Sequence, residues 1–287
     1  MRRFHIDLGL ICLLVGCANL TCDKNVKESI VRANQGVNLA KAKAYGAAEK
    51  ELETAVTLDP RNHFAAFNLG QVYSDQSKRD KAADAFAKAV KEIPDEARYR
   101  YRLARALYES DKLDTAQTEF EEAIKLNNRL FKAHWYLGRI YYRQDKPQDA
   151  AKSWSEACRL NPGFGKPFVD LGKLYYSWDK LDEAARVLSQ GAMYTRDPED
   201  LTNVYYYLGM TYDAQKLYDK AAEAYLNAIQ AKRENVEARL QAGLSYAAKG
   251  DKENAKKYLQ EFLKMGGGQN QFNITVATER LGKLAWE

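Results

Sequence analysis

Apolar and small residues recur along most of this chain at spacings of three and four residues, the spacing of one face of an α-helix. Within residues 131–164, Leu137 with Gly138 opens one such set, and Ala150 with Trp154 opens a second. Polar residues occupy most of the positions between them. The pattern therefore predicts two amphipathic helices in this window, each with an apolar stripe along one side.

The residues between and after these two segments favour a short turn and a helix end. Pro147 follows Asp-Lys and suits the first turn of the second helix, where the missing N–H of proline needs no partner. Pro162 ends that helix, because the residue before a proline is biased away from helical backbone angles. Small Gly138 lets the two backbones approach closely, and large Trp154 fills the space beside them. We expect an antiparallel helix pair.

The same arrangement recurs at a shift of 34 residues along almost the whole sequence, for example with a Leu-Gly pair at 69–70 and again at 208–209. One such unit cannot bury its own apolar stripe, so neighbouring units must stack. Three extra residues, 199–201, precede the sixth unit, and we expect a bend there. The windows are 29–62, 63–96, 97–130, 131–164, 165–198, 202–235 and 236–269.

This pattern resembles the tetratricopeptide repeat family, whose unit of about 34 residues has the form W-x₂-L-G-x₂-Y…A-x₃-F…P. The tryptophan of that form is missing throughout, and His134 stands in its place in the fourth window. The resemblance implies an all-α fold, a right-handed superhelical solenoid of seven helix-turn-helix repeats over residues 29–269. In residues 270–287, apolar residues from Ile274 to Leu284 recur at helical spacing. We expect them to form a helix that caps the last repeat.

The N-terminus has the features of a secretion signal. Met-Arg-Arg precedes an apolar run over residues 8–16, which is shorter than the ~20 residues that span a bilayer. The segment Leu-Val-Gly-Cys at 14–17 resembles the lipobox of bacterial lipoproteins. This resemblance implies that residues 1–16 are a signal peptide, that Cys17 is lipidated, and that residues 17–28 form a tether. The alternatives are a signal peptide cleaved elsewhere and a hydrophobic N-terminus that arises by chance.

The residue after this cysteine is Ala18. In lipoproteins of Gram-negative cells an aspartate there retains the protein in the inner membrane, so the resemblance implies an outer-membrane lipoprotein that faces the periplasm. Outer-membrane tetratricopeptide lipoproteins that help to assemble type IV pilus secretins share the lipobox and the repeat array. They typically have six repeats and an Asn-Asn-Tyr-Gly segment in repeat three, where this chain reads Tyr-Arg-Leu-Ala at 101–104.

Composition and candidate chemistry favour a binding protein over an enzyme. The chain has 287 residues, of which 46% are hydrophobic and 29% charged, and this suits a folded protein better than a disordered one. Its three histidines and four cysteines form no cluster at metal-ligand spacing. No nucleophile, base and oxyanion donor can be grouped from the sequence. We therefore expect no catalytic residues, no cofactor and no metal site.

The net charge of +5 is small, but the family resemblance places most of it on one surface. In the family, positions two, five, six, nine, twelve and thirteen of each repeat line the concave face. In repeats three to five these positions hold eight basic and two acidic residues, a balance of +6, whereas in the other repeats they sum to −2. The predicted partner-binding residues are the basic and aromatic ones: Arg98, Tyr101, Arg102, Arg105, Tyr108, Lys132, Trp135, Tyr136, Arg139, Tyr142, Arg143, Lys166, Lys173 and Tyr176.

Basic and aromatic side chains together suit an acidic, partly apolar protein segment, because guanidinium groups grip carboxylates and aromatic rings hold apolar side chains. We therefore predict a non-enzymatic, lipid-anchored adaptor that binds a protein or peptide partner and helps to assemble a cell-envelope complex. The alternatives are a ligand that is an anionic envelope glycan or lipopolysaccharide, and an ordinary solvated helix face. The mild net charge gives no reason to expect a nucleic acid partner. The sequence does not predict an oligomeric state.

Overall fold

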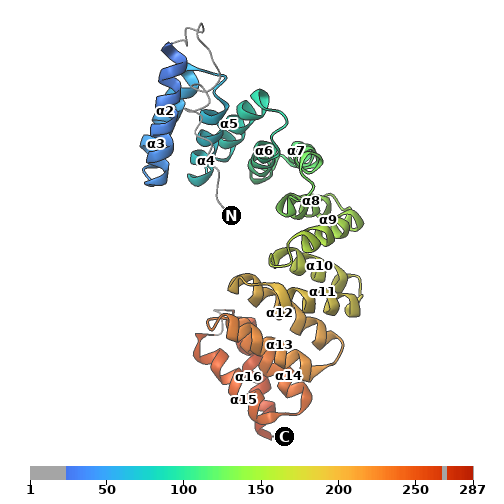
Figure 1. The fold of residues 1–287 in the computed structure, drawn as a ribbon. Coiled ribbons are helices and arrows are strands. Elements are labelled where there is room, and N and C mark those ends of the chain that lie inside the picture. The colour runs from blue at the N-terminus through green and yellow to red at the C-terminus, as the bar shows by residue number, and fades with distance from the viewer. Residues whose placement is uncertain (1–23, 267–269, 287) are drawn as a thin grey trace. The chain divides into compact units, whose positions relative to one another are not determined.

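The computed structural model describes residues 24–266 and 270–286, which contain fifteen α-helices and no β-strand (Figure 1). The chain folds into two compact units, residues 1–119 and 120–287. The helices are α2 (Lys24–Lys41), α3 (Tyr45–Leu58), α4 (His63–Asp75), α5 (Arg79–Glu92), α6 (Ala97–Glu109), α7 (Leu113–Leu126), α8 (Phe131–Arg143), α9 (Pro147–Leu160), α10 (Lys166–Ser177), α11 (Leu181–Tyr194), α12 (Pro198–Ala214), α13 (Tyr218–Ala231), α14 (Val236–Lys249), α15 (Lys252–Lys264) and α16 (Gln271–Trp286). The predicted all-α fold of consecutive helix pairs is confirmed.

In the first unit, helix pairs form where the sequence places a glycine opposite a large residue. Helix α2 packs against α3, and α4 packs against α5. A Cβ atom added to Gly36 would lie 2.6 Å from Leu52 Cγ, and one added to Gly70 would lie 2.7 Å from the Phe86 ring. These glycines therefore permit the close helix approach that the pattern predicts.

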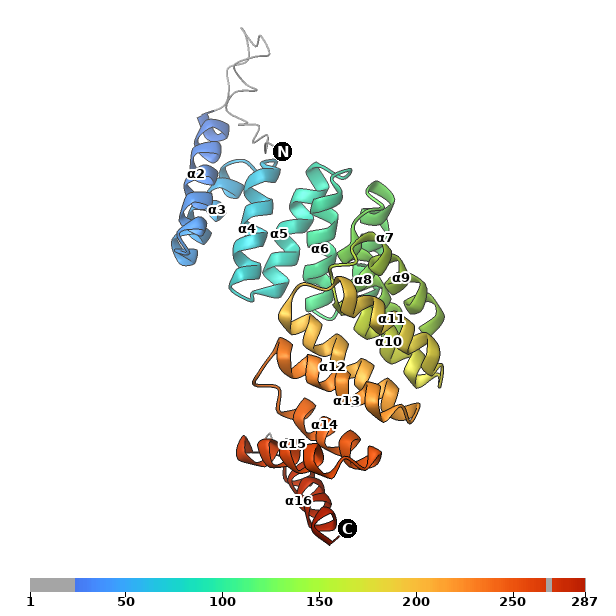
Figure 2. The same ribbon diagram turned by 60° about the horizontal axis from the view of Figure 1, so that its bottom comes forward.

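The second unit repeats this packing in α8 with α9, α10 with α11, α12 with α13 and α14 with α15, and each pair contacts the next (Figures 1 and 2). A Cβ atom on Gly138 would lie 2.5 Å from the Trp154 indole. Trp154 is buried, and its Nε1 donates to the Trp135 carbonyl over 3.2 Å. Phe168 and Leu188 are fully buried between successive pairs. The core is thus a continuous seam that joins neighbouring pairs.

The turn inside several pairs uses one residue with left-handed backbone angles. Asp145 has a φ of 57°, and Asp179 has a φ of 58°. Aspartate tolerates this region better than most residues. The Lys146 N–H donates to the Tyr141 carbonyl over 2.9 Å and so closes the end of α8. Pro147 then lies in the first turn of α9, where the sequence placed it.

The three extra residues before the sixth window, 199–201, do not form a loop. Helix α12 begins at Pro198, and the Asp197 carboxylate accepts a hydrogen bond from the Asp200 N–H over 2.9 Å, which caps the helix. The extra residues therefore lengthen the first helix of this pair to 17 residues.

Helix α16 packs against both helices of the last pair, α14 and α15. Its Ala277 and Leu284 are buried in a cluster with Leu240 and Phe262. Arg280 donates to the Ala247 carbonyl over 3.1 Å. The C-terminal helix therefore covers apolar surface that the last pair could not bury alone.

The predicted signal peptide, residues 1–16, and the lipidation site Cys17 lie outside the described residues. Helix α2 begins at Lys24, so the end of the segment predicted as a tether is helical. Glu28 and Arg32 form an ion pair over 3.3 Å at helical spacing. The first turn of α2, Lys-Asn-Val-Lys, is mostly polar and carries no apolar stripe by which the sequence could reveal a helix. None of the helices within 24–266 and 270–286 has the length and apolar character needed to cross a bilayer.

Candidate partner-binding surface

Helices α8, α10 and α12 are the first helices of three successive pairs in the second unit, and they carry three adjoining cavities. Cavity A, of about 360 Å³, lies between α8, α9 and α10, and cavity B, of about 270 Å³, lies between α8, α10 and α12. Cavity C, of about 190 Å³, lies between α10, α11 and α12. Arg139 and Asp170 line both A and B, and Lys173 lines both A and C. The cavities therefore belong to one surface, which we call the α8–α10–α12 surface.

Trp135 organises the basic side chains at the centre of this surface. Its Nε1 donates to Asp170 Oδ2 over 2.7 Å. The Arg139 guanidinium carbon lies 5.1 Å from the centroid of the indole, and Lys166 Nζ lies 5.7 Å from it. Both distances are within the ~6 Å at which a cation is attracted to an aromatic face. One buried indole therefore donates a hydrogen bond to a carboxylate and lies within cation–π distance of two basic side chains.

The Asp170 carboxyl group faces three basic residues. Burial raises the pKa of Asp170, and the Trp135 hydrogen bond and the charges of Arg139, Lys173 and Lys166 act in the opposite direction. Although the residue as a whole is half-buried, its carboxyl group points into the protein toward Trp135. Asp170 is not the only carboxylate near these cations, because Glu199 and Asp200 also line cavity B and Asp200 interacts electrostatically with Lys166. The basic excess lies at cavity A, which is lined by Arg139, Arg143 and Lys173 and by one acidic residue, Asp170.

Aromatic side chains lie beside this basic cluster. Tyr142 is 54% exposed and packs against Trp154, with ring centroids 5.8 Å apart. Tyr176 is 38% exposed, and Lys173 Nζ lies 5.0 Å from the centroid of the Tyr207 ring. The surface thus offers exposed rings next to positive charge, the combination that protein interfaces favour at their hot spots.

The structure brings together half of the predicted partner-binding residues. Those that line the three cavities are Trp135, Arg139, Tyr142, Arg143, Lys166, Lys173 and Tyr176. Lys132 is exposed on α8, with its Nζ 5.8 Å from the Phe131 ring, and Tyr136 stacks on Phe120 with the rings 5.4 Å apart.

The prediction that Trp135 offers its ring to a partner needs correction. Its side chain is only 8% exposed and belongs to the core cluster that includes Trp154 and Phe168. Trp135 occupies position five of its repeat. Its side chain lies against the neighbouring helix α10, because the indole N–H donates a hydrogen bond to Asp170 of that helix. Trp135 therefore supports the surface from below.

The five predicted residues on α6, which are Arg98, Tyr101, Arg102, Arg105 and Tyr108, belong to the first unit. The Arg98 guanidinium carbon lies 4.8 Å from the centroid of the Phe67 ring. Arg105 Nε donates to Glu109 over 2.7 Å. Part of the positive charge predicted for this helix is therefore engaged within the unit itself.

The sequence did not indicate the six residues of α12 that complete the surface, which are Glu199, Asp200, Asn203, Tyr207, Met210 and Thr211. Asn203 lines cavity B, and Tyr207 and Met210 line cavity C. They occupy positions two, six and nine of their repeat, so the positional rule selects them. A comparison of charged residues did not identify Asn203, Tyr207 or Met210, because none of them carries a charge.

Comparison with known proteins agrees with this architecture. Family models described as tetratricopeptide repeat match residues 34–97, 101–163, 202–235 and 237–265. The search of curated proteins gave no match.

Among solved structures, the C-terminal part of a repeat-containing protein from Cytophaga hutchinsonii shares 14% identity and a TM-score of 0.67, over 85% of this chain and 98% of that one. YrrB, described as a TPR protein with an unusual peptide-binding site, shares 21% identity and a TM-score of 0.55, over 69% of this chain and 99% of its own. Pseudomonas aeruginosa PilF shares 18% identity and a TM-score of 0.58, over 75% of this chain and 96% of its own. At these identities the likeness concerns the fold. The family matches and the helix pairs together show that this chain belongs to the tetratricopeptide repeat family.

Proposed function

We propose that this protein is a non-enzymatic scaffold that binds an acidic, partly apolar segment of a partner protein on the α8–α10–α12 surface. Tetratricopeptide repeats typically serve protein–protein interaction, and the fold neighbour YrrB is described as having a peptide-binding site. The observation that carries the proposal is the arrangement of Arg139, Lys166 and Lys173 on aromatic rings around adjoining cavities.

The chemistry of these side chains favours carboxylates in the ligand. Ammonium and guanidinium groups form charge-assisted hydrogen bonds with carboxylates, which are about twice as strong as neutral ones. The rings of Trp135 and Tyr207 lie against the cations and reduce the conformational freedom that binding would otherwise remove. Exposed Tyr142 and Tyr176 offer apolar area on either side. An acidic segment with apolar residues nearby matches both features.

We also propose that the protein is held at the outer membrane by a lipid on Cys17, faces the periplasm and helps to assemble an envelope complex, of which a type IV pilus is one candidate. This proposal rests on the Leu-Val-Gly-Cys segment at 14–17 and on Ala18. A lipid anchor would keep the scaffold beside membrane-bound partners and raise their effective concentration.

The binding proposal is tested with a synthetic peptide rich in Glu and Leu and a second peptide in which every Glu is replaced by Gln. We expect the acidic peptide alone to bind, with an affinity that falls as salt is added. Arg139→Gln combined with Lys173→Gln should weaken binding by about 10- to 100-fold, because each cation contributes on the order of 1 kcal/mol at an exposed site.

The matched control removes two charges from other helices of the same unit. Lys125 and Lys152 lie on α7 and α9, with side chains 75% and 79% exposed. Lys125→Gln combined with Lys152→Gln should leave the affinity unchanged, and circular dichroism should show both double variants folded. Equal weakening by both pairs would mean that only net charge matters. Binding of a soluble anionic glycan in place of the peptide would favour the glycan-binding function.

A further inference from the structure

Cavity C differs in character from the basic cluster beside it. Its floor consists of Gly172, Leu188 and Thr211, and the Leu188 and Thr211 side chains are 0% and 1% exposed. Thr211 Oγ1 donates to the Tyr207 carbonyl over 2.8 Å, so its only hydroxyl group is already satisfied within α12. The floor therefore offers a ligand mainly methyl and methylene groups, with no unsatisfied polar atom.

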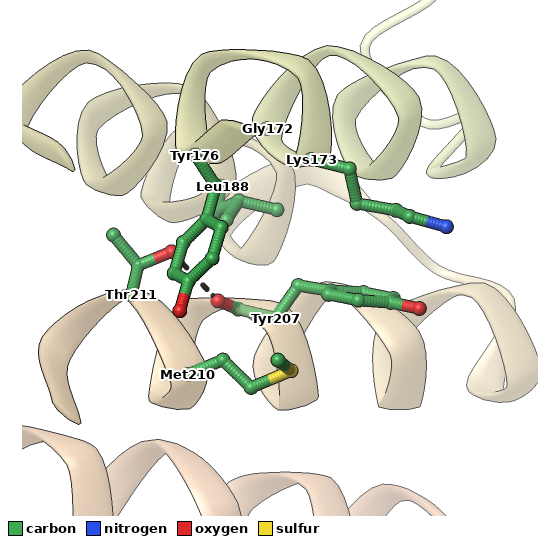
Figure 3. A pocket seen from close by; sticks show the side chains of 7 residues that line it. All are labelled: Gly172, Lys173, Tyr176, Leu188, Tyr207, Met210 and Thr211. Atoms are coloured by element: carbon green, nitrogen blue, oxygen red, sulfur yellow. Dashed lines mark hydrogen bonds between the residues drawn. The ribbon is translucent and has the colours of Figure 1, made fainter. Parts of the chain in front are cut away.

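The rim of cavity C is aromatic and flexible. Tyr176 from α10 and Tyr207 from α12 form two of its walls, and Met210 forms a third (Figure 3). Methionine adapts its shape to the group it packs against. Figure 3 shows the Lys173 amine and the Tyr207 hydroxyl directed to the same side of the view, away from Tyr176 and Thr211. These two polar atoms thus leave the apolar interior open, whereas the Tyr176 hydroxyl is drawn on the Thr211 side of the cavity.

Size and chemistry indicate what this cavity could hold. An apolar cavity of roughly 150 Å³ in another protein accommodates a benzene molecule. At about 190 Å³, cavity C has room for one large apolar side chain. Water would gain few hydrogen bonds there, so its replacement by an apolar group is favourable.

Lys173 links cavity C to the charged part of the surface. Its Nζ lies 5.0 Å from the centroid of the Tyr207 ring at the edge of cavity C, and the same residue lines cavity A together with Arg139 and Asp170. A carboxylate held by Lys173 would therefore lie beside the mouth of cavity C. The two subsites share one residue, so a short segment of a partner can reach both.

We propose that cavity C is a specificity pocket for a large apolar residue, such as leucine, that lies close in sequence to the acidic residue bound by Lys173. The inference rests on the proposed function and narrows it, since it defines the partner segment as an acidic residue with a neighbouring apolar anchor. Charge at the basic cluster selects acidic segments, and cavity C selects among them.

The test uses synthetic peptides with a fixed Glu-Glu pair in a Ser-Gly background and one variable residue, placed in turn at each flanking position. At every position, leucine is compared with alanine. At one or two positions we expect leucine to bind about 10-fold more tightly than alanine, because burying the extra apolar groups is favourable. At the remaining positions the two peptides should bind alike.

A pair of tyrosine variants assigns that preference to cavity C. Tyr176→Ala removes one wall at an exposed position, and Tyr194→Ala, at a residue 44% exposed on α11, is the matched control. Tyr176→Ala should reduce the leucine preference, measured as the ratio of the affinities of the leucine and alanine peptides for the same variant, to less than about threefold. Tyr194→Ala should keep the full preference.

The outcomes separate this inference from the proposed function. If no peptide of the set binds the wild-type chain, the proposal that the protein binds an acidic segment is wrong, and so is the inference about cavity C. If the acidic peptides bind but leucine gives no gain at any position, or if the gain survives in the Tyr176→Ala variant, the function stands and the pocket inference is wrong.

Discussion

The close helix contact at Gly138 gives a quantitative test of how each repeat is held together. A Cβ atom at this position would lie 2.5 Å from Cδ1 and Nε1 of Trp154. These atoms belong to a rigid ring that is only 3% exposed and also donates to the Trp135 carbonyl. Gly138→Ala must therefore push α8 away from α9 or turn the indole and stretch its hydrogen bond.

The expected cost combines two opposing contributions. Adding a methylene-sized group to a tightly packed core costs up to about 3 kcal/mol. Replacing glycine by alanine within a helix gains about 1 kcal/mol of helix propensity. We therefore expect Gly138→Ala to lower the free energy of unfolding by roughly 1–2 kcal/mol. Gly46→Ala in α3 is the control, because no heavy atom lies within 4 Å of its added Cβ, and it should be neutral or stabilising by up to about 1 kcal/mol.

Urea unfolding followed by circular dichroism measures both free energies, and hydrogen exchange shows where the change occurs. Because a solenoid is stabilised by contacts between neighbours, faster exchange in Gly138→Ala should concentrate in residues 131–160 and the adjacent helices. A Gly138→Ala variant as stable as Gly46→Ala would refute the idea that the glycine is required by close packing against Trp154.

Three further predictions concern the two ends of the chain and a partly buried acid, Asp213. Cys17→Ser should abolish labelling with radioactive palmitate and move the protein out of the membrane fraction; unchanged labelling and sedimentation would exclude the lipid anchor. Removal of residues 271–287 should raise hydrogen exchange in α14 and α15, which lose the apolar cover of α16, and uniform protection would count against a capping role. Burial raises the pKa of Asp213, which accepts hydrogen bonds from Tyr225 and Ser245. The folded state therefore binds this proton more tightly than the unfolded state, so the stabilising contribution is complete below about pH 4 and is lost as the pH rises through the folded pKa. In urea titrations the free energy of unfolding of the wild type should fall relative to that of Asp213→Asn between pH 4 and pH 7. A difference between the two free energies that does not change with pH would contradict this.

The sequence predicts the helix pairs well because their packing is local. Gly138 and Trp154 are 16 residues apart in one repeat, and the spacing of small and large residues determines how the two helices meet. The starts of α2 and α12 could not be predicted in the same way. Their first turns are mostly polar, and in α12 the polar residues cap the helix, so no apolar periodicity marks them.

The candidate site is less predictable because it depends on contacts between repeats. Position five of a repeat indicated that Trp135 lies on the inner surface, but its burial follows from a hydrogen bond to Asp170, 35 residues away. Cavity C requires side chains from three helices, and its Tyr207 and Met210 carry no charge that a count could detect. A positional rule therefore identifies which helices contribute, and only the packed structure shows which side chains are accessible.

The central claim, that an acidic segment binds on the α8–α10–α12 surface, is tested most directly by locating a bound peptide. An acidic, leucine-containing peptide that carries a photoreactive phenylalanine derivative is bound to the full chain, irradiated, and the cross-linked residues are identified by mass spectrometry. The account predicts cross-links concentrated on α8, α10 and α12, around Tyr142, Tyr176 and Met210, and their loss in the variant with both Arg139→Gln and Lys173→Gln. Cross-links that fall mainly on α9, α11 and α13, or that persist in this variant, would contradict it.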